Sequence, residues 1–381
     1  MSKASADGLR GFAVRFLGWM LGLLCTRRPH MRVRLCIVKC DRMGDFILAV
    51  STIRLLLAEV PEHEALLVCH PSGAGIAAVE FPGLRRVVLP DPGRCGSLAT
   101  LLAVLRQWAC LRGIFADRVV CLRHQRRIRD ELALRFIRTS CLLALPGDGL
   151  SSPLSRDIPA GDHGMQFCGE LMRHRDLAEQ VMGRSIPMGS VLPVLAAVGV
   201  CGTARADGDA FALVAPLAGH GSESLRNMPS PLVRAGIAAL HASGVRRVFL
   251  CGLPVQRGAL RDIAGSLHME GLLVEILSAR GFAEMVQMIR RARMVLTADS
   301  ASAHIAAALD RPMVAVLGGG HPGQFAPWSR SARQVWLTRS VECAGCNWRC
   351  PFETPRCITE IPPEIVADGI HRALAVRCGS E

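Results

Sequence analysis

The residues best suited to chemistry lie within positions 294–324, where an apolar run is followed by a polar turn, a helical pattern, a second apolar run and a glycine loop. The first run ends at Asp299, and the next residue, Ser300, is a good cap for the helix that follows. Amides in the first turn of a helix attract anions. This order of elements predicts a binding site for a phosphorylated ligand at the carboxyl edge of a sheet.

The second apolar run, residues 313–317, leads directly into three consecutive glycines. Glycine has no Cβ, so these positions let the backbone approach a ligand more closely than any residue with a side chain. Two neighbouring strand ends would then face one ligand. We expect the glycine loop to contact the same ligand as the helix after Asp299, through Gly318, Gly319 and Gly320.

A second candidate lies near the N-terminus, where Asp45 stands between an apolar strand pattern (residues 35–39) and an apolar helical pattern (46–57). A carboxylate at the carboxyl edge of a sheet is placed to take a proton from a substrate hydroxyl. The alternative role for Asp at the start of a helix is to cap it. Position alone favours the cap.

The elements that must position these residues alternate between strand and helix patterns. The alternation begins at Arg34, weakens between residues 145 and 205, and resumes near residue 211. Such alternation indicates βαβ units with parallel sheets, so we expect two Rossmann-like halves joined by a linker near residues 186–209. The predicted parts are an amphipathic N-terminal segment (1–30), an N-terminal Rossmann-like domain (31–190), a C-terminal Rossmann-like domain (205–358) and a C-terminal helix (359–381).

Composition narrows the class of protein. The chain has 381 residues, 50% of them hydrophobic, and a formal net charge of +13 that is spread along its length. This charge favours anionic partners without choosing among phosphate, membrane lipid and nucleic acid. Tyr is absent and the other aromatic residues do not cluster among the arginines, which argues against nucleic-acid binding. Most of the 16 cysteines stand singly, and several lie in predicted strands, as expected for buried thiols in a reducing compartment.

The N-terminal residues 11–25 form an apolar stretch that Arg15 interrupts. This stretch is too short to span a bilayer. Its apolar residues recur at helical spacing, which fits an interfacial helix with Phe12, Phe16 and Trp19 facing lipid. The same stripe fits a helix packed on its own domain, and the two interpretations stay open.

Taken together, two segments resemble the signature regions of glycosyltransferase family 9, the bacterial heptosyltransferases. They are KCDRMGDFILAVSTIRLL (39–56) and LTADSASAHIAAALDRPMVAVLGGG (296–320). The stretch before the second region, LSARGFAEMVQMIRRARMV (277–295), and the tail CAGCNWRCPFETPRCITEIPPEIV (343–366) are similar to the same family. The resemblance extends over roughly residues 33–367, with a weak middle, and rests on the order and separation of the segments.

The resemblance implies an α/β fold of GT-B type, with two Rossmann-like domains facing across a cleft, the acceptor on the first and the nucleotide sugar on the second. It implies that Asp45 is the catalytic base of an inverting transfer of heptose from ADP-heptose to the lipopolysaccharide core, with no cofactor required. The enzyme would be cytoplasmic and peripheral on the cytoplasmic face of the inner membrane. Residues next to the base would bind the acceptor: Arg42, Met43 and Gly44.

The resemblance also assigns the donor site. Arg226 stands where the family usually has Lys, and Met228 where it usually has Trp. The family Gly after Ser300 is Ala301, and a later family Asp is His321, so another nucleotide-sugar donor is an alternative, as is a protein (autotransporter) acceptor. The implied donor contacts are Arg226, Ser222, Asp299, Ser300, Ala301, His304 and the glycine loop.

The tail carries four cysteines at the spacing C-x2-C-x3-C-x6-C: Cys343, Cys346, Cys350 and Cys357. Four thiolates are a suitable ligand set for a structural zinc or iron ion. The intervals are short for a zinc ribbon, so the sequence leaves a metal site and plain thiols as alternatives.

Two further matches indicate other classes of protein. Gly73, Gly75 and Ala78 satisfy the G-x-G-x-x-A pattern of NAD-dependent oxidoreductases, but they follow the second predicted strand, whereas the motif belongs after the first. The sequence Asp207-Gly208-Asp209 matches the DxD of metal-dependent sugar transfer but lies in the predicted linker. Beside the oxidoreductase, a nucleic-acid binder built on the cysteine cluster is the other alternative class, and it predicts steep salt dependence.

Overall fold

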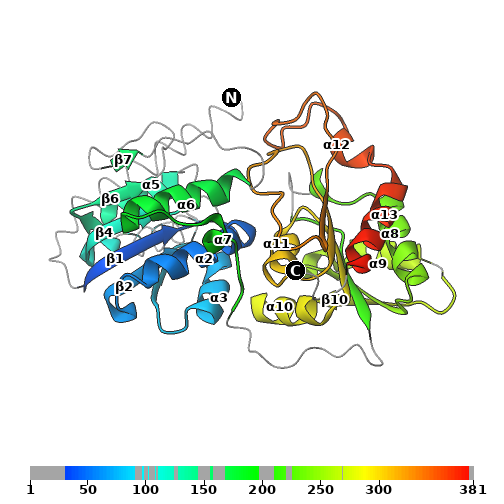
Figure 1. Ribbon diagram of the computed structural model, residues 1–381, viewed down its shortest axis with the longest axis horizontal. Helices are drawn as coiled ribbons and strands as arrows, with labels where there is room; N and C mark the ends of the chain where they lie inside the picture. The colour runs from blue at the N-terminus through cyan, green and yellow to red at the C-terminus, as the bar shows by residue number, and fades with distance from the viewer. Residues whose placement is uncertain are drawn as a thin grey trace. The chain divides into compact units, whose positions relative to one another are not determined.

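The computed structural model describes residues 31–90, 97, 102, 108, 110–123, 128–144, 155–157, 168–196, 210–219, 225–267 and 269–376 (Figure 1). The chain divides into two compact units. The first comprises Met1–His163 and Glu170–Val191, and the second comprises Gly164–Gly169 and Leu192–Glu381.

The first unit is built on a parallel sheet with the strand order β3-β2-β1-β4-β6-β7, in which β5 pairs with β4. Its central strands are buried along nearly their whole length, as expected for a parallel sheet covered on both faces. The strands are β1 (Met31–Lys39), β2 (Ala65–Cys69), β3 (Arg85–Val88), β4 (Ile114–Cys121), β5 (Arg138–Thr139), β6 (Leu142–Ala144) and β7 (Ser155–Asp157).

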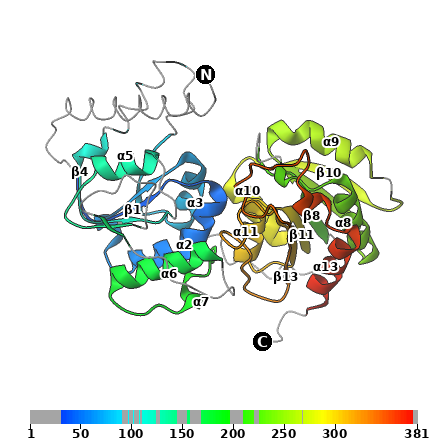
Figure 2. The same cartoon turned by 90° about the horizontal axis from the view of Figure 1, so that it is seen from above.

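Helices cover both faces of this sheet. Figure 2 shows α2, α6 and α7 together on one face and α5 on the other. A hydrogen bond of 3.3 Å between the His174 ring and the Leu48 carbonyl ties α6 to α2. The helices are α2 (Met43–Leu57), η1 (Glu62–Glu64), α3 (Pro71–Glu80), η3 (Cys110–Gly113), α5 (Ile128–Phe136), α6 (Gly169–Met182) and α7 (Met188–Val191).

The second unit contains a six-stranded parallel sheet with the order β10-β9-β8-β11-β12-β13. Three of its strands, β8, β11 and β12, are buried at every position. The strands are β8 (Phe211–Ala215), β9 (Arg247–Gly252), β10 (Leu273–Ser278), β11 (Met294–Ala298), β12 (Met313–Val316) and β13 (Gln334–Leu337).

In the second unit, α8, α9 and α13 lie on one face of the sheet, and α10 and α11 lie on the other (Figure 1). Gly236 of α8 faces Leu296 of β11 and two apolar residues of α13, so helix and sheet approach closely there. The helices are α8 (Ser230–Ala242), η5 (Pro254–Gln256), α9 (Arg257–Gly265), α10 (Phe282–Arg291), α11 (Ala301–Ala308), α12 (Arg356–Thr359) and α13 (Pro363–Ala375).

Both sheets have the doubly wound strand order, in which the chain moves outward in one direction and then reverses. This confirms the prediction of two Rossmann-like halves. The reversal lies between β1 and β4 in the first unit and between β8 and β11 in the second. Loops after these central strands diverge, which opens the carboxyl edge of each sheet to a ligand.

Among the helices described here, none combines the length and the apolar character needed to cross a bilayer. The predicted amphipathic segment 1–30 lies outside the described residues, as do the predicted linker residues 197–209.

Candidate active site

Asp45 lies at the carboxyl edge of the first sheet, in the first turn of α2. The helix begins at Met43 with Arg42 as its N-cap, and no side chain caps it. Asp45 is therefore the third helical residue, and the capping alternative was wrong. Its side chain is half-buried, whereas Arg42, which the resemblance assigned with Met43 and Gly44 to the acceptor, is exposed.

A buried ammonium group lies at the end of β1, two residues before the turn. The Lys39 side chain is fully buried, and its Nζ donates to the Leu122 carbonyl at 2.6 Å. The same Nζ lies 2.9 Å from Asp41 Oδ2 and 3.3 Å from Glu170 Oε1. Lys39 thus joins β1, the segment after β4 and helix α6 through one charged group.

A second buried cation completes this network on the other side of Asp41. Arg123 Nη1 lies 2.9 Å from Asp41 Oδ1 and 3.0 Å from Asp130 Oδ2. His174 Nε2 lies 3.5 Å from Glu170 Oε1. No sequence motif predicted this network, although charged residues stand at or just after the ends of β1 and β4, on both sides of the reversal point.

The surroundings raise the pKa of Asp45 to about 7. Burial is the main cause, and repulsion by the Asp41 carboxylate adds to it, while Lys39 acts in the opposite direction. A carboxylate with a pKa near neutrality is a stronger base than an ordinary aspartate and is still ionised in a useful fraction at pH 7. The geometry therefore suits Asp45 to general-base chemistry.

In the second unit, the turn between β11 and α11 has the predicted form. Ser300 is the N-cap of α11, and its hydroxyl accepts a hydrogen bond from the Ser302 amide at 3.3 Å. The Thr297 hydroxyl lies 3.2 Å from the Ser300 hydroxyl and holds it in place. Ala301 is the first helical residue, a position that an L-residue adopts without strain, so Ala in place of the family Gly fits the backbone.

Arg226 belongs to the loop after β8. Two hydrogen bonds join the start of this loop to the residues that follow Arg226. The Asn227 side chain accepts from the Ala218 amide at 2.8 Å, and the Met228 amide donates to the Pro216 carbonyl at 2.8 Å. The Met228 side chain, at the position of the family Trp, is buried in the core of the unit. These bonds hold Arg226 near the carboxyl end of β8.

The charge of Arg226 acts on two residues of the turn after β11. Burial raises the pKa of Asp299, and Arg226 together with the Gly318 amide opposes that rise. Burial and, to a smaller extent, the charge of Arg226 together lower the pKa of His304 to about 4. The structure therefore brings Arg226, Asp299, His304 and Gly318 together at one edge, as an anion-binding site requires.

His304 is neutral at physiological pH because its pKa is low. Its Nδ1 accepts a hydrogen bond from Trp328 Nε1 at 3.1 Å, which leaves the proton on Nε2. The two ring planes are nearly parallel, at 9°, with centroids 6.1 Å apart. Packing in the core thus orients His304, and its Nε2 remains a hydrogen-bond donor.

The glycine loop has a close neighbour that the sequence did not indicate. A Cβ on Gly318 or on Gly320 would overlap the Trp348 indole, and a Cβ on Gly319 would lie 3.3 Å from Cys357 Cβ. The glycines therefore make room for this tryptophan, and their contact with a ligand stays a prediction. Arg226 lies over the same indole, with Cζ 5.4 Å from the ring centroid.

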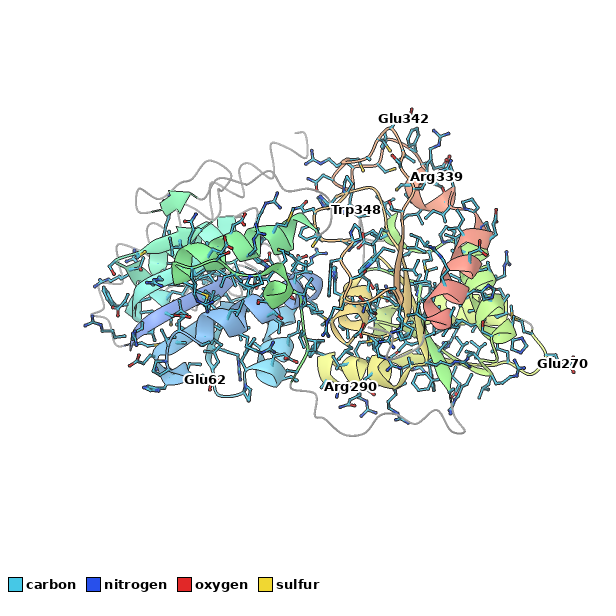
Figure 3. The ribbon with its side chains drawn as sticks, viewed as in Figure 1. Glu62, Glu270, Arg290, Arg339, Glu342 and Trp348 are labelled. Atoms are coloured by element: carbon cyan, nitrogen blue, oxygen red, sulfur yellow. The ribbon has the colours of Figure 1, made fainter. Side chains whose placement is uncertain are left out.

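Trp348 is carried by the long segment between β13 and α12. Figure 3 places Glu342 at the outer end of this segment and Trp348 nearer the sheet. Amides of Gly345 and Asn347 donate to the carbonyls of Gly319 and Gly320 at 2.8 and 3.0 Å. The cysteine-containing tail is thus bonded to the glycine loop and supports the side chain on which Arg226 rests.

The four tail cysteines line one small cavity with Trp348, and the charges of the other three act on the Cys357 thiol. All four are free thiols. Within the part of the chain that the structure describes, no three Cys, His, Asp or Glu side chains are placed to share a metal ion. The thiols in this arrangement do not fit the zinc or iron site that their spacing suggested.

Of three other candidates from the sequence, two lie outside the described residues and one is explained by helix packing. Ser222 and the Asp207-Gly208-Asp209 motif lie outside the described residues. The G-x-G-x-x-A motif lies inside α3, after β2, where Gly73 makes room for the Phe46 ring of α2. Its first glycine therefore serves helix packing.

The packing of Trp348 gives a first prediction. We expect Gly320→Ala to destabilise the protein by about 1–3 kcal/mol, because the added methyl would overlap the Trp348 indole. Urea unfolding followed by tryptophan fluorescence measures the change. Gly258→Ala in α9 is the matched control, since nothing lies within 4 Å of its Cβ, and Ala favours a helix. Equal stability of the two variants would contradict the packing described here.

Part of the chain matches a known protein family. Residues 234–350 match the family model of glycosyltransferase family 9 (heptosyltransferase). A lipopolysaccharide heptosyltransferase 1 of Pseudomonas aeruginosa is 29% identical over 137 residues. That match covers 32% of this chain and 38% of the curated relative, so it spans well under half of either protein.

Solved structures resemble the chain over nearly its whole length. The Escherichia coli ADP-heptose LPS heptosyltransferase II has a TM-score of 0.64 and 18% identity, covering 90% of this chain and 99% of the other. A glycosyltransferase family 9 protein from Veillonella parvula has a TM-score of 0.67 and 14% identity, covering 92% and 99%. These likenesses show that the fold is the predicted GT-B type, built from two Rossmann-like units.

Proposed function

We propose that this chain, which carries a glycosyltransferase family 9 domain, is an inverting heptosyltransferase that moves heptose from ADP-heptose to the lipopolysaccharide core. The observation that carries the proposal is Asp45, a half-buried carboxyl group at the reversal point of the first sheet whose pKa is raised to about 7. Two likenesses support the substrates: the curated relative is a lipopolysaccharide enzyme, and one structural neighbour is named for ADP-heptose.

In the proposed reaction, the Asp45 carboxylate takes the proton from an acceptor hydroxyl while that oxygen attacks the anomeric carbon of the donor. The bond from this carbon to the diphosphate oxygen breaks, and the configuration inverts because attack comes from the opposite face. The electron pair leaves with ADP. Stabilising the charge that develops on the leaving group is an electrostatic task and requires no cofactor.

Residues of the second unit would stabilise the departing diphosphate. Arg226 supplies a positive charge beside the N-terminus of α11, whose first amides point outward from the end of β11. The neutral His304 offers its Nε2 proton as a further donor. Asp299 accepts from the Gly318 amide and so fixes the glycine loop next to this site.

The acceptor and the location of the enzyme are proposed from charge. A net charge of +13 favours an anionic acceptor, as a phosphorylated lipopolysaccharide core is, and favours an anionic membrane surface. We therefore place the enzyme in the cytoplasm, peripheral on the inner membrane.

Thermal-shift binding tests the proposed donor. We expect ADP and ADP-heptose to raise the melting temperature, with UDP, GDP and NAD having little effect, because a ligand at 100 times its Kd stabilises the native state by about 2.7 kcal/mol. Release of ADP in the presence of heptose-deficient lipopolysaccharide core then tests transfer. Preference for UDP or GDP would replace the donor, and stabilisation by NAD alone would overturn the transferase.

A further inference from the structure

Burying the network of charged groups around Asp45 costs free energy. Lys39 and Asp130 are 0% exposed, Glu170 is 1% and Asp41 is 3% exposed. Removing several charges from water costs several kcal/mol for each ion, and apolar residues of similar size are often as stabilising. Fold stability alone therefore gives little reason for two cations and several carboxylates at this edge of the sheet.

Among the residues that the structure describes, the charged groups near Asp45 include more carboxyl groups than cations. Two cations, Lys39 and Arg123, face four carboxyl groups: Asp41, Asp45, Asp130 and Glu170. Asp41, Asp130 and Glu170 each lie within 3.3 Å of a cation, whereas Asp45 forms no ion pair with any described residue. With two cations for four carboxyl groups, a proton is held most easily by the carboxyl group that lacks a cation.

The Asp41 carboxylate lies between two buried cations. Its two oxygens are each 2.9 Å from a different cation, Oδ2 from Lys39 and Oδ1 from Arg123. Lys39 is the last residue of β1, and Arg123 lies two residues after β4, the strand that pairs with β1. Two cations anchored at neighbouring strand ends therefore fix the position from which the Asp41 charge acts on Asp45.

We propose that Asp41 is a positioning residue that sets the proton affinity of the base Asp45. Clamped between Lys39 and Arg123, its carboxylate repels a negative charge on Asp45 and makes that group a stronger base. The inference rests on the proposed function, in which Asp45 takes a proton from the acceptor. Asp41 itself touches no substrate in this scheme.

The sign of the effect follows from the groups that face Asp45 from each element. Asp41 and Glu170 raise its pKa, whereas Lys39 and Arg123 lower it. His174 and Asp130 affect Asp45 only indirectly, through their ion pairs with Glu170 and Arg123. The base form of Asp45 is present above a pKa of about 7, so activity should fall as pH falls through 7, and removing the Asp41 charge should move this decline to lower pH.

The pH dependence of kcat/KM tests the proposal. We expect the acidic limb, near pH 7 in the wild type, to move down by about one pH unit in Asp41→Asn, the scale of shift that a nearby charge produces. Glu170→Gln should give a smaller shift in the same direction and provides a second variant if Asp41→Asn folds poorly. Asp130→Asn is the matched control, because it removes a buried carboxylate of the same network that does not act directly on Asp45.

Carbon-13 NMR of the aspartate carboxyl groups gives a readout independent of turnover. The resonance missing in Asp45→Asn identifies Asp45, and its titration should occur at lower pH in Asp41→Asn than in the wild type. An unmoved titration, or an equal shift in Asp130→Asn, would refute the role of Asp41 while leaving the base intact. Normal activity of Asp45→Asn would instead refute the proposed base.

Discussion

Replacing Asp45 by Asn should lower kcat for sugar transfer by about 100- to 10,000-fold, the contribution usual for a general base. The carboxamide has nearly the same size as the carboxyl group but does not accept a proton at neutral pH. Because Asp45 forms no ion pair with a described residue, the substitution leaves the buried cations with their partners. We therefore expect the loss to appear in turnover, without a loss of stability.

Release of ADP from the donor in the presence of acceptor measures this loss. Asp117→Asn is the control, because Asp117 lies in the same unit but forms an exposed ion pair with Arg32, of a kind that contributes little to stability. Circular dichroism and the melting temperature establish that both variants are folded. Turnover of Asp45→Asn within a few fold of the wild type would remove Asp45 from the mechanism.

Replacing Arg226 by Gln should lower kcat/KM by about 100- to 1,000-fold, as the loss of one group that stabilises a developing anion does. The substitution removes the charge that acts on Asp299 and His304 at the end of α11. Arg226→Lys should retain part of the activity, because the charge remains while the planar group that lies over Trp348 is lost. Calorimetric binding of ADP should weaken in the same order.

A second readout tests the placement of Arg226 without any substrate. Its charge lowers the pKa of His304, so Arg226→Gln should raise that pKa above its value of about 4, as proton NMR of the imidazole would show. Arg234→Gln, at an exposed position of α8, should change neither the pKa nor ADP binding. An unchanged pKa of His304 in Arg226→Gln would separate the two residues and remove Arg226 from the site.

The order and type of the helices and strands follow from local patterns in the sequence. Alternating apolar runs and helical patterns predict βα units because these periods depend on neighbours only a few positions apart. Ser300 as the cap of α11 follows from the same local chemistry, since the hydroxyl bonds an amide two residues later. The doubly wound order of both sheets agrees with the two Rossmann-like halves inferred from this alternation.

The surroundings of the proposed base depend on contacts between distant segments. Lys39 and Glu170 are 131 positions apart, and Arg123 meets Asp41 across 82 positions, so no local pattern shows that these charges are buried together. The basicity of Asp45 depends on that burial and on Asp41, which is why sequence position favoured the wrong role, a helix cap.

The proposed donor site likewise combines features that are visible in the sequence with features that depend on packing. Three glycines in a row are visible in the sequence, but the Trp348 indole that occupies the space beside them comes from a segment about 30 residues later. The four cysteines have the spacing of metal ligands, yet among the described residues no three Cys, His, Asp or Glu side chains are placed to share a metal ion. Spacing fixes which side chains are available, whereas distances between them, and hence charge, basicity and ligation, depend on how distant segments pack.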